Sequence, residues 1–214
     1  MKTMPTNMTA NKTGKLLFKL AVGAALGFFA GFGFESLVDI ERLASDQVMV
    51  SFVGLSYSVM GLIVGFGVIA PKWGARILNV QDTDDIRDQR RILAGSAFCA
   101  FILGAALTAL AMAGPGGILS PLASFGGLVA ALAIQIVISI RDWKLYDEMY
   151  RALTRDAGNL SFLVIGGVLM IWSSAAWVGL VAGPTPLGLI ALVSGGFLVA
   201  MFVVAARRGL MLSQ

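Results

Sequence analysis

The sequence predicts an all-α membrane protein, a bundle of six transmembrane helices with both termini in the cytoplasm. Its composition is 57% hydrophobic and 13% charged, with a mean hydropathy of +0.85, far from the averages of soluble domains. The charged residues also avoid the interior of six apolar stretches that make up more than half of the chain, with Lys19 at the edge of the first. Each stretch has about the 20 residues that a helix needs to cross a hydrocarbon core of roughly 30 Å.

The predicted spans are 16–34, 48–70, 92–113, 122–140, 162–182 and 187–206. They leave little of the chain outside the membrane, so we expect a single transmembrane domain and no separate soluble domain. Residues 1–14 form the expected flexible cytoplasmic tail. Lysines ahead of an apolar stretch resemble a secretory signal. However, the apolar stretch of the first span is too long for a typical signal core, and no small-residue cleavage site follows it. We therefore expect the first span to be a retained anchor.

The distribution of positive charge predicts the orientation, because cytoplasmic segments retain Lys and Arg during insertion. The N-terminal segment through Lys19, the loops 71–91 and 141–161, and the terminal pair Arg207 and Arg208 hold all but one of the 16 Lys and Arg residues. The opposite side has only Arg42. Alternating spans therefore place both termini in the cytoplasm, and the compact, loop-poor chain without a sorting signal favours a bacterial inner membrane.

Short amphipathic helices are expected between the spans. In 141–155 the residues Trp143, Tyr146, Tyr150 and Leu153 recur at helical spacing, which predicts a helix that lies along the headgroups or extends the fourth span. Two charge pairs with i,i+4 spacing on its other face support this helix, namely Lys144–Glu148 and Asp147–Arg151.

Two further short helices are expected in other loops. One begins near Asp82 and runs into the third span, with Arg90 and Arg91 snorkelling at the boundary. The other lies at 36–46 on the outer side and carries acidic residues. Those acids form either a solvated surface or a vestibule that attracts cations.

Glycine spacing is the clearest motif within the membrane. Lipid gives helices no hydrophobic reason to associate, so small residues that let two backbones approach are how spans pack. These glycines serve packing inside one bundle or an interface with a second copy or a partner protein. The predicted helix-packing residues are Gly23, Gly27 and Gly31 in the first span and Gly54, Gly61 and Gly65 in the second.

A thin layer of neutral polar residues lies within the spans. If the second and fifth spans face each other, these residues form a midplane site of the kind that transporters use. The alternative is that the serines bond to their own backbone or serve as small packing residues. The candidate site residues are Ser56, Tyr57, Ser58, Gln135, Trp172, Ser173 and Ser174.

The residues that are missing exclude several function classes. No Asp, Glu, Lys, Arg or His lies at membrane depth, which disfavours proton- or sodium-coupled transport. The chain has no histidine and one cysteine, Cys99, so ligands for a metal or haem are lacking and no cofactor is expected. Cytoplasmic cations are interleaved with acids, which argues against nucleic-acid binding. The expectation is a protein that is not an enzyme.

Two function classes remain. The first is a non-catalytic subunit, scaffold or assembly partner in a membrane complex, in contact with membrane lipids and with a partner protein or a second copy. The alternative is a small uncoupled transporter or channel for a neutral or lipid-like solute, with a midplane site between the second and fifth spans. The segments 113–141 and 182–207 carry similar turn residues. This indicates either duplicated hairpins or the ordinary use of Gly and Pro at turns.

Overall fold

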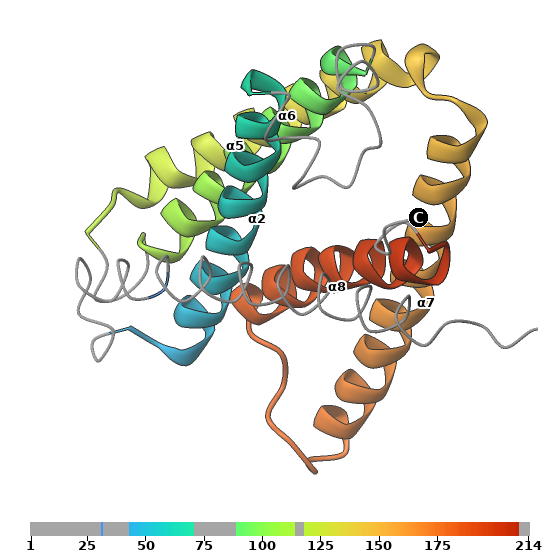
Figure 1. The fold of residues 1–214 in the computed structure, drawn as a ribbon. Coiled ribbons are helices and arrows are strands. Elements are labelled where there is room, and N and C mark those ends of the chain that lie inside the picture. Colours follow the sequence, from blue (N-terminus) through green and yellow to red (C-terminus); the bar gives the residue numbers. More distant parts are fainter. Residues whose placement is uncertain (1–30, 32–42, 71–88, 114–117, 210–214) are drawn as a thin grey trace, which may run out of the picture.

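The computed structural model describes residues 31, 43–70, 89–113 and 118–209. These residues are all-helical, as the sequence predicts, and five of the helices are long and apolar enough to cross a membrane. The first predicted span lies outside them except for Gly31. The helices are α2 (Ser45–Ile69), α5 (Arg90–Ala111), α6 (Pro121–Asp142), the 3₁₀ turn η2 (Trp143–Leu145), α7 (Glu148–Trp177) and α8 (Pro186–Arg207) (Figure 1).

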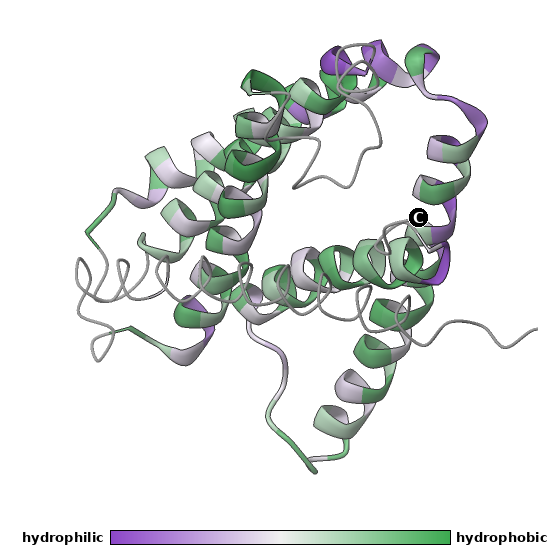
Figure 2. Cartoon of the chain, viewed as in Figure 1, coloured by the Kyte–Doolittle hydropathy of each residue, from purple (hydrophilic) through white to green (hydrophobic). Residues whose placement is uncertain are grey.

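The long helices form two groups that meet at α8. Helix α2 packs on α5, and α5 packs on α6, whereas α7 packs on α8. Helix α8 also contacts α2 and so joins the α7–α8 hairpin to the other three helices (Figure 1). Hydrophilic residues gather where α6 passes into α7 and beside the end of α8, while the bodies of the helices are mostly apolar (Figure 2).

Polar contacts tie the helix ends together at both ends of the bundle. The Asp46 carboxylate accepts a hydrogen bond from the Thr185 hydroxyl at 2.9 Å, which joins the start of α2 to the start of α8. At the opposite end Arg91 of α5 contacts Asp142 of α6 at 3.4 Å. Helices α2 and α8 therefore begin at the same end, whereas α5 and α6 run in opposite directions.

The junction between α6 and α7 differs from the predicted amphipathic helix over 141–155. Helix α6 ends at Asp142, and a new helix begins at Glu148 because the Asp147 carboxylate accepts a hydrogen bond from the Tyr150 amide at 2.7 Å. Such a side chain satisfies an amide that a helix start leaves unpaired. The predicted helix is therefore mostly the first turns of α7, and Asp147 caps this helix at the position where a charge pair with Arg151 was expected.

Helix α7 ends five residues before the predicted end of the fifth span at 182. Gly179 has φ of +80°, a conformation that favours glycine. The Gly179 amide donates to the Ala176 carbonyl at 3.0 Å, and the Leu180 amide donates to Ala175 at 2.9 Å. This pair of bonds is a Schellman motif. The motif ends the helix within an apolar stretch that hydropathy alone predicts to be one continuous span.

Glycines bring α2 and α5 into backbone contact. A Cβ atom placed on Gly54 would lie 2.7 Å from the Gly104 carbonyl oxygen, and one on Gly61 would lie 2.6 Å from the backbone of Ala97 and Phe101. The close approach is mutual, because a Cβ atom placed on Gly104 would lie 2.4 Å from the Gly54 carbonyl oxygen. Larger side chains at these positions would force the helices apart.

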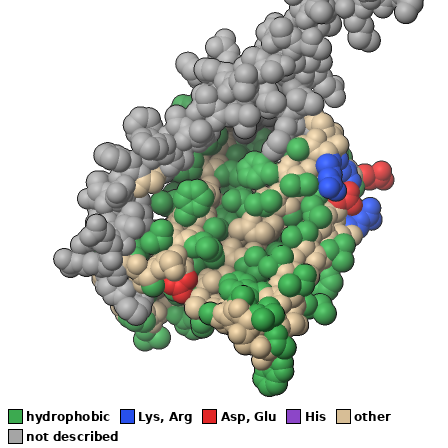
Figure 3. All heavy atoms as spheres, turned by 90° about the horizontal axis from the view of Figure 1, so that it is seen from below, with side chains coloured by type: hydrophobic (Ala, Val, Ile, Leu, Met, Phe, Trp, Pro, Cys, Tyr) green, Lys and Arg blue, Asp and Glu red, His purple; other side chains and the backbone are tan. Residues whose placement is uncertain are grey.

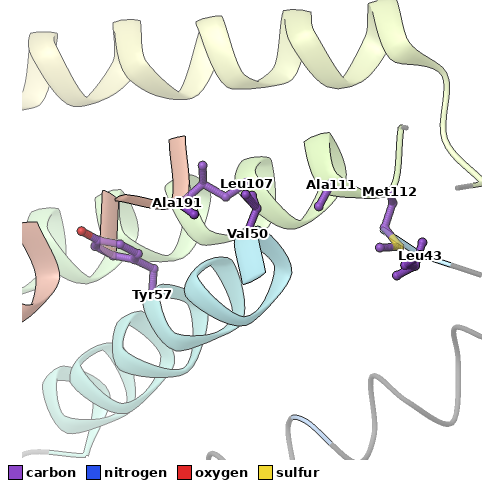
Figure 4. Packing of buried hydrophobic residues seen from close by; sticks show 7 residues of the cluster. All are labelled: Leu43, Val50, Tyr57, Leu107, Ala111, Met112 and Ala191. Atoms are coloured by element: carbon purple, nitrogen blue, oxygen red, sulfur yellow. The ribbon is translucent and has the colours of Figure 1, made fainter. Parts of the chain in front are cut away.

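The hydrophobic core lies where α2, α5 and α8 meet (Figure 4). Two polar side chains are buried on the α2 surface near this core, each with 1% exposure: Gln47 and Ser51. The Gln47 carboxamide accepts from the Ala44 amide at 2.9 Å and donates to the Ala111 carbonyl at 2.7 Å. The Ser51 hydroxyl has no hydrogen-bond partner among the described residues. The core residues are Leu43, Val50, Tyr57, Leu107, Ala111, Met112 and Ala191.

Replacing Gly61 by alanine should destabilise the protein. The new methyl group overlaps the α5 backbone, and overpacking of this kind costs about 1–3 kcal/mol. Thermal unfolding in detergent measures the change, with Gly65→Ala as the control because its Cβ would meet Ala97 at an ordinary 3.8 Å. Equal unfolding temperatures for the two variants would contradict the close approach.

Replacing Ser51 by alanine should stabilise the protein by about 1 kcal/mol, because it removes a buried hydroxyl that has no partner in the described part of the chain. The matched control is Ser161→Ala, since the Ser161 hydroxyl is also buried but donates to the Ala157 carbonyl at 2.7 Å. The same unfolding measurement distinguishes them. A lower unfolding temperature for Ser51→Ala would show that its hydroxyl is paired.

Candidate functional site

A cavity of about 740 Å³ lies between the five long helices. Its size falls within the roughly 300–1,000 Å³ that is usual for small-molecule sites. Side chains from all five helices line it, including Tyr57, Leu107, Leu132, Leu169 and Ile190. Seen from below, the molecule presents hydrophobic side chains around a hollow, while the Lys and Arg side chains gather at one edge (Figure 3). The candidate site is therefore an open apolar hollow between helices that are long enough to cross a membrane.

Three hydroxyl groups belong to the cavity wall, and all three donate to backbone carbonyls. Tyr57 donates to the Ser194 carbonyl at 2.9 Å, and Ser194 donates to Ile190 at 2.6 Å. Ser161 donates to Ala157 at 2.7 Å. Because their protons are already engaged, these groups offer a ligand only their oxygen lone pairs. The wall is suited to an apolar molecule with few polar atoms.

Two adjacent glycines of α8 determine how closely this helix approaches α2 and α7, which also line the cavity. A Cβ on Gly195 would lie 3.3 Å from the Val53 side chain of α2, and one on Gly196 would lie 2.7 Å from the Ile165 side chain of α7. Successive helical residues point about 100° apart, so these two positions serve two different neighbours. The Tyr57 hydrogen bond to Ser194 fixes the same level of α8 to α2.

The predicted midplane layer is dispersed, and only Tyr57 of its residues lines the cavity. Ser56 donates to the Phe52 carbonyl of its own helix at 2.8 Å. Gln135 donates across the α5–α6 contact to the Cys99 carbonyl at 2.9 Å. The remaining residues lie against neighbouring backbone or face outward: Ser58 packs on Gly104, Trp172 donates to the Ala182 carbonyl at 2.9 Å, and Ser173 and Ser174 are exposed.

The predicted packing glycines fall into two groups. Gly54 and Gly61 lie at the α2–α5 contact, and Gly65 faces Ala97 at an ordinary distance. Gly23 and Gly27 lie outside the described residues, as do most of the outer segment 36–46 and the helix start expected near Asp82. Gly31 is helical, but the chain on both sides of it lies outside the described residues.

A buried carboxylate at the end of α6 was not predicted from the sequence. The Asp142 side chain is only 2% exposed and contacts Arg141 of its own helix and Arg91 of α5. It fits there because α5 carries Gly95, whose Cβ would lie 3.1 Å from the carboxylate. The signal in the sequence was a glycine one turn after Arg91, which leaves room for a side chain of the neighbouring helix.

Aromatic residues stack beside this carboxylate. The rings of Tyr146 and Tyr150 are stacked with centroids 6.0 Å apart, and the Arg151 guanidinium lies 5.8 Å from the Trp143 ring. Burial raises the pKa of the Tyr146 hydroxyl, and the negative charge of Asp142 raises it further. Within the described part of the chain, no group of three or more His, Cys, Asp or Glu side chains is placed to hold a metal ion.

Comparisons of this chain with protein-family models, with curated proteins and with solved structures found no match.

Proposed function

We propose that this chain is a non-catalytic integral membrane protein that binds a neutral, lipid-like molecule between its helices and acts as a small uncoupled transporter or carrier. The observation that carries this proposal is the apolar cavity of about 740 Å³ with engaged hydroxyl groups. Among the described residues that line it, Tyr57 is the only one with an ionisable side chain. Such a wall offers neither a general base nor a charge for ion coupling.

The proposal includes six spans in a bacterial inner membrane, with both termini in the cytoplasm. Five apolar helices of suitable length support it. A second support is that all but one of the Lys and Arg residues fall on the predicted cytoplasmic side. The sixth span of this arrangement is the predicted stretch 16–34. Contacts at the two ends of the bundle, between α2 and α8 and between α5 and α6, support the alternation of helix direction.

Membership in a membrane complex as a subunit or scaffold is the second candidate function. A line of small residues on α6 favours it, because Gly126, Ala130 and Ala133 are exposed and recur at i, i+4 and i+7. A Cβ on Gly126 would meet no described atom within 4 Å. A stripe of this kind lets another helix approach closely in lipid, whether from a second copy or from another membrane protein.

Replacing Leu169 by tryptophan should reduce ligand binding at least tenfold, because the indole takes up cavity space. Photolabelling with a diazirine-bearing diacylglycerol in nanodiscs measures occupancy. The matched control is Leu163→Trp, since Leu163 lies on the same helix but is 70% exposed. Equal labelling of both variants and wild type would contradict a site in the cavity, and labelled peptides confined to the outer surfaces would do the same.

Replacing both Gly126 and Ala130 by leucine should abolish assembly if α6 is an interface. Light scattering coupled to size exclusion after gentle detergent extraction gives the protein mass of each particle. Ser139→Leu is the control, because Ser139 is exposed on another face of the same helix. A monomer without co-purifying protein in the wild type would remove the subunit proposal and leave the cavity proposal standing.

A further inference from the structure

A buried carboxylate holds two arginines at the end of the bundle where α5 begins and α6 ends. Asp142 Oδ1 lies 3.0 Å from Arg141 Nε and 3.4 Å from Arg91 Nη2. Arg141 also donates through Nη2 to the second carboxylate oxygen at 3.4 Å. Because Asp142 is enclosed against Gly95, both arginines are held by an acceptor that is itself fixed in position.

The cluster retains an excess of positive charge and free surface. Two guanidinium groups face one carboxylate, so the cluster carries one net positive charge. The Arg91 and Arg141 side chains are 58% and 55% exposed. Each guanidinium has five N–H donors, of which the carboxylate engages one or two. Among the described residues no other acceptor engages the remaining donors, which can therefore meet an oxyanion that approaches from outside.

An apolar surface leads away from the arginines along α6. Val137 lies one helical turn before Arg141 and is 64% exposed, and Ile140 is 71% exposed. Trp143, half-exposed, follows at the same helix end, where aromatic residues mark the headgroup level of a membrane. Donors for an oxyanion thus lie directly beside an exposed apolar surface.

We propose that Arg91 and Arg141, positioned by Asp142, bind the phosphate of an anionic membrane lipid whose acyl chain lies on the exposed Val137 and Ile140 side of α6. Guanidinium groups match phosphate oxygens in geometry and charge, and basic pockets between transmembrane helices are suited to anionic headgroups. None of these residues lines the cavity, so this site is independent of the proposed carrier function.

Replacing Arg91 or Arg141 by glutamine tests the site. Each change should weaken binding of phosphatidylglycerol about fivefold, the usual effect of one cation near an anionic headgroup. Native mass spectrometry of the full chain, titrated with phosphatidylglycerol or phosphatidylcholine, measures lipid adducts. Arg155→Gln is the matched control, since Arg155 is exposed near the same end of the bundle but outside the cluster. An Arg91→Gln or Arg141→Gln effect no larger than that of the control would overturn the proposal.

Replacing Asp142 by asparagine separates positioning from simple attraction. The change adds a net positive charge, so a diffuse electrostatic effect would strengthen phosphatidylglycerol binding, whereas loss of positioning weakens it toward the phosphatidylcholine level. Thermal unfolding of the same sample checks that the variant is folded. Stronger binding by folded Asp142→Asn would overturn the assigned role. Equal competition by inorganic phosphate and by phosphatidylglycerol would overturn a lipid as the ligand.

Discussion

The backbone contact between α2 and α5 is the constraint on which the rest of the structure depends. Two helices in hydrocarbon gain little from burying apolar side chains, because lipid is equally apolar, so their association rests on close packing. Gly54, Gly61 and Gly104 remove the side chains that would prevent this packing. The α2–α5 pair then provides the surface on which α6 packs from one side and α8 from another.

The α7–α8 hairpin has a looser relation to this pair. It is joined to α2 through α8, by the Tyr57 hydrogen bond and the Gly195 contact. Its own packing depends on a small cluster of Leu153, Ala157 and Val204 and on the ion pair between Arg208 and Asp156. The cavity lies between the tightly packed helices and this hairpin, so its volume depends on the few contacts that α8 makes with α2.

Periodic features of the sequence were sufficient to predict the helices, while features that need a neighbouring helix were not. Apolar length located the five described spans, and glycine spacing located Gly54 and Gly61. No other glycine lies four residues before or after Gly104 in its own helix. Its role in helix packing therefore becomes apparent only from the position of α2. The burial of the Asp142 carboxylate depends on Gly95 of the neighbouring helix α5, so the sequence around Asp142 does not reveal it. Ser56 of the predicted polar layer donates to the Phe52 carbonyl of its own helix, and Ser173 and Ser174 are exposed, outcomes that hydropathy does not encode.

The adjacent glycines of α8 tie the register of that helix to its two neighbours. Gly195 faces α2 and Gly196 faces α7, so both contacts depend on how many residues separate this pair from Pro186, where the helix begins. One inserted or deleted residue would rotate the pair by about 100° and direct both glycines away from their partners. The length of this segment is therefore under stricter constraint than its composition, and evolutionary change in α8 should proceed by substitution while insertions are confined to its ends.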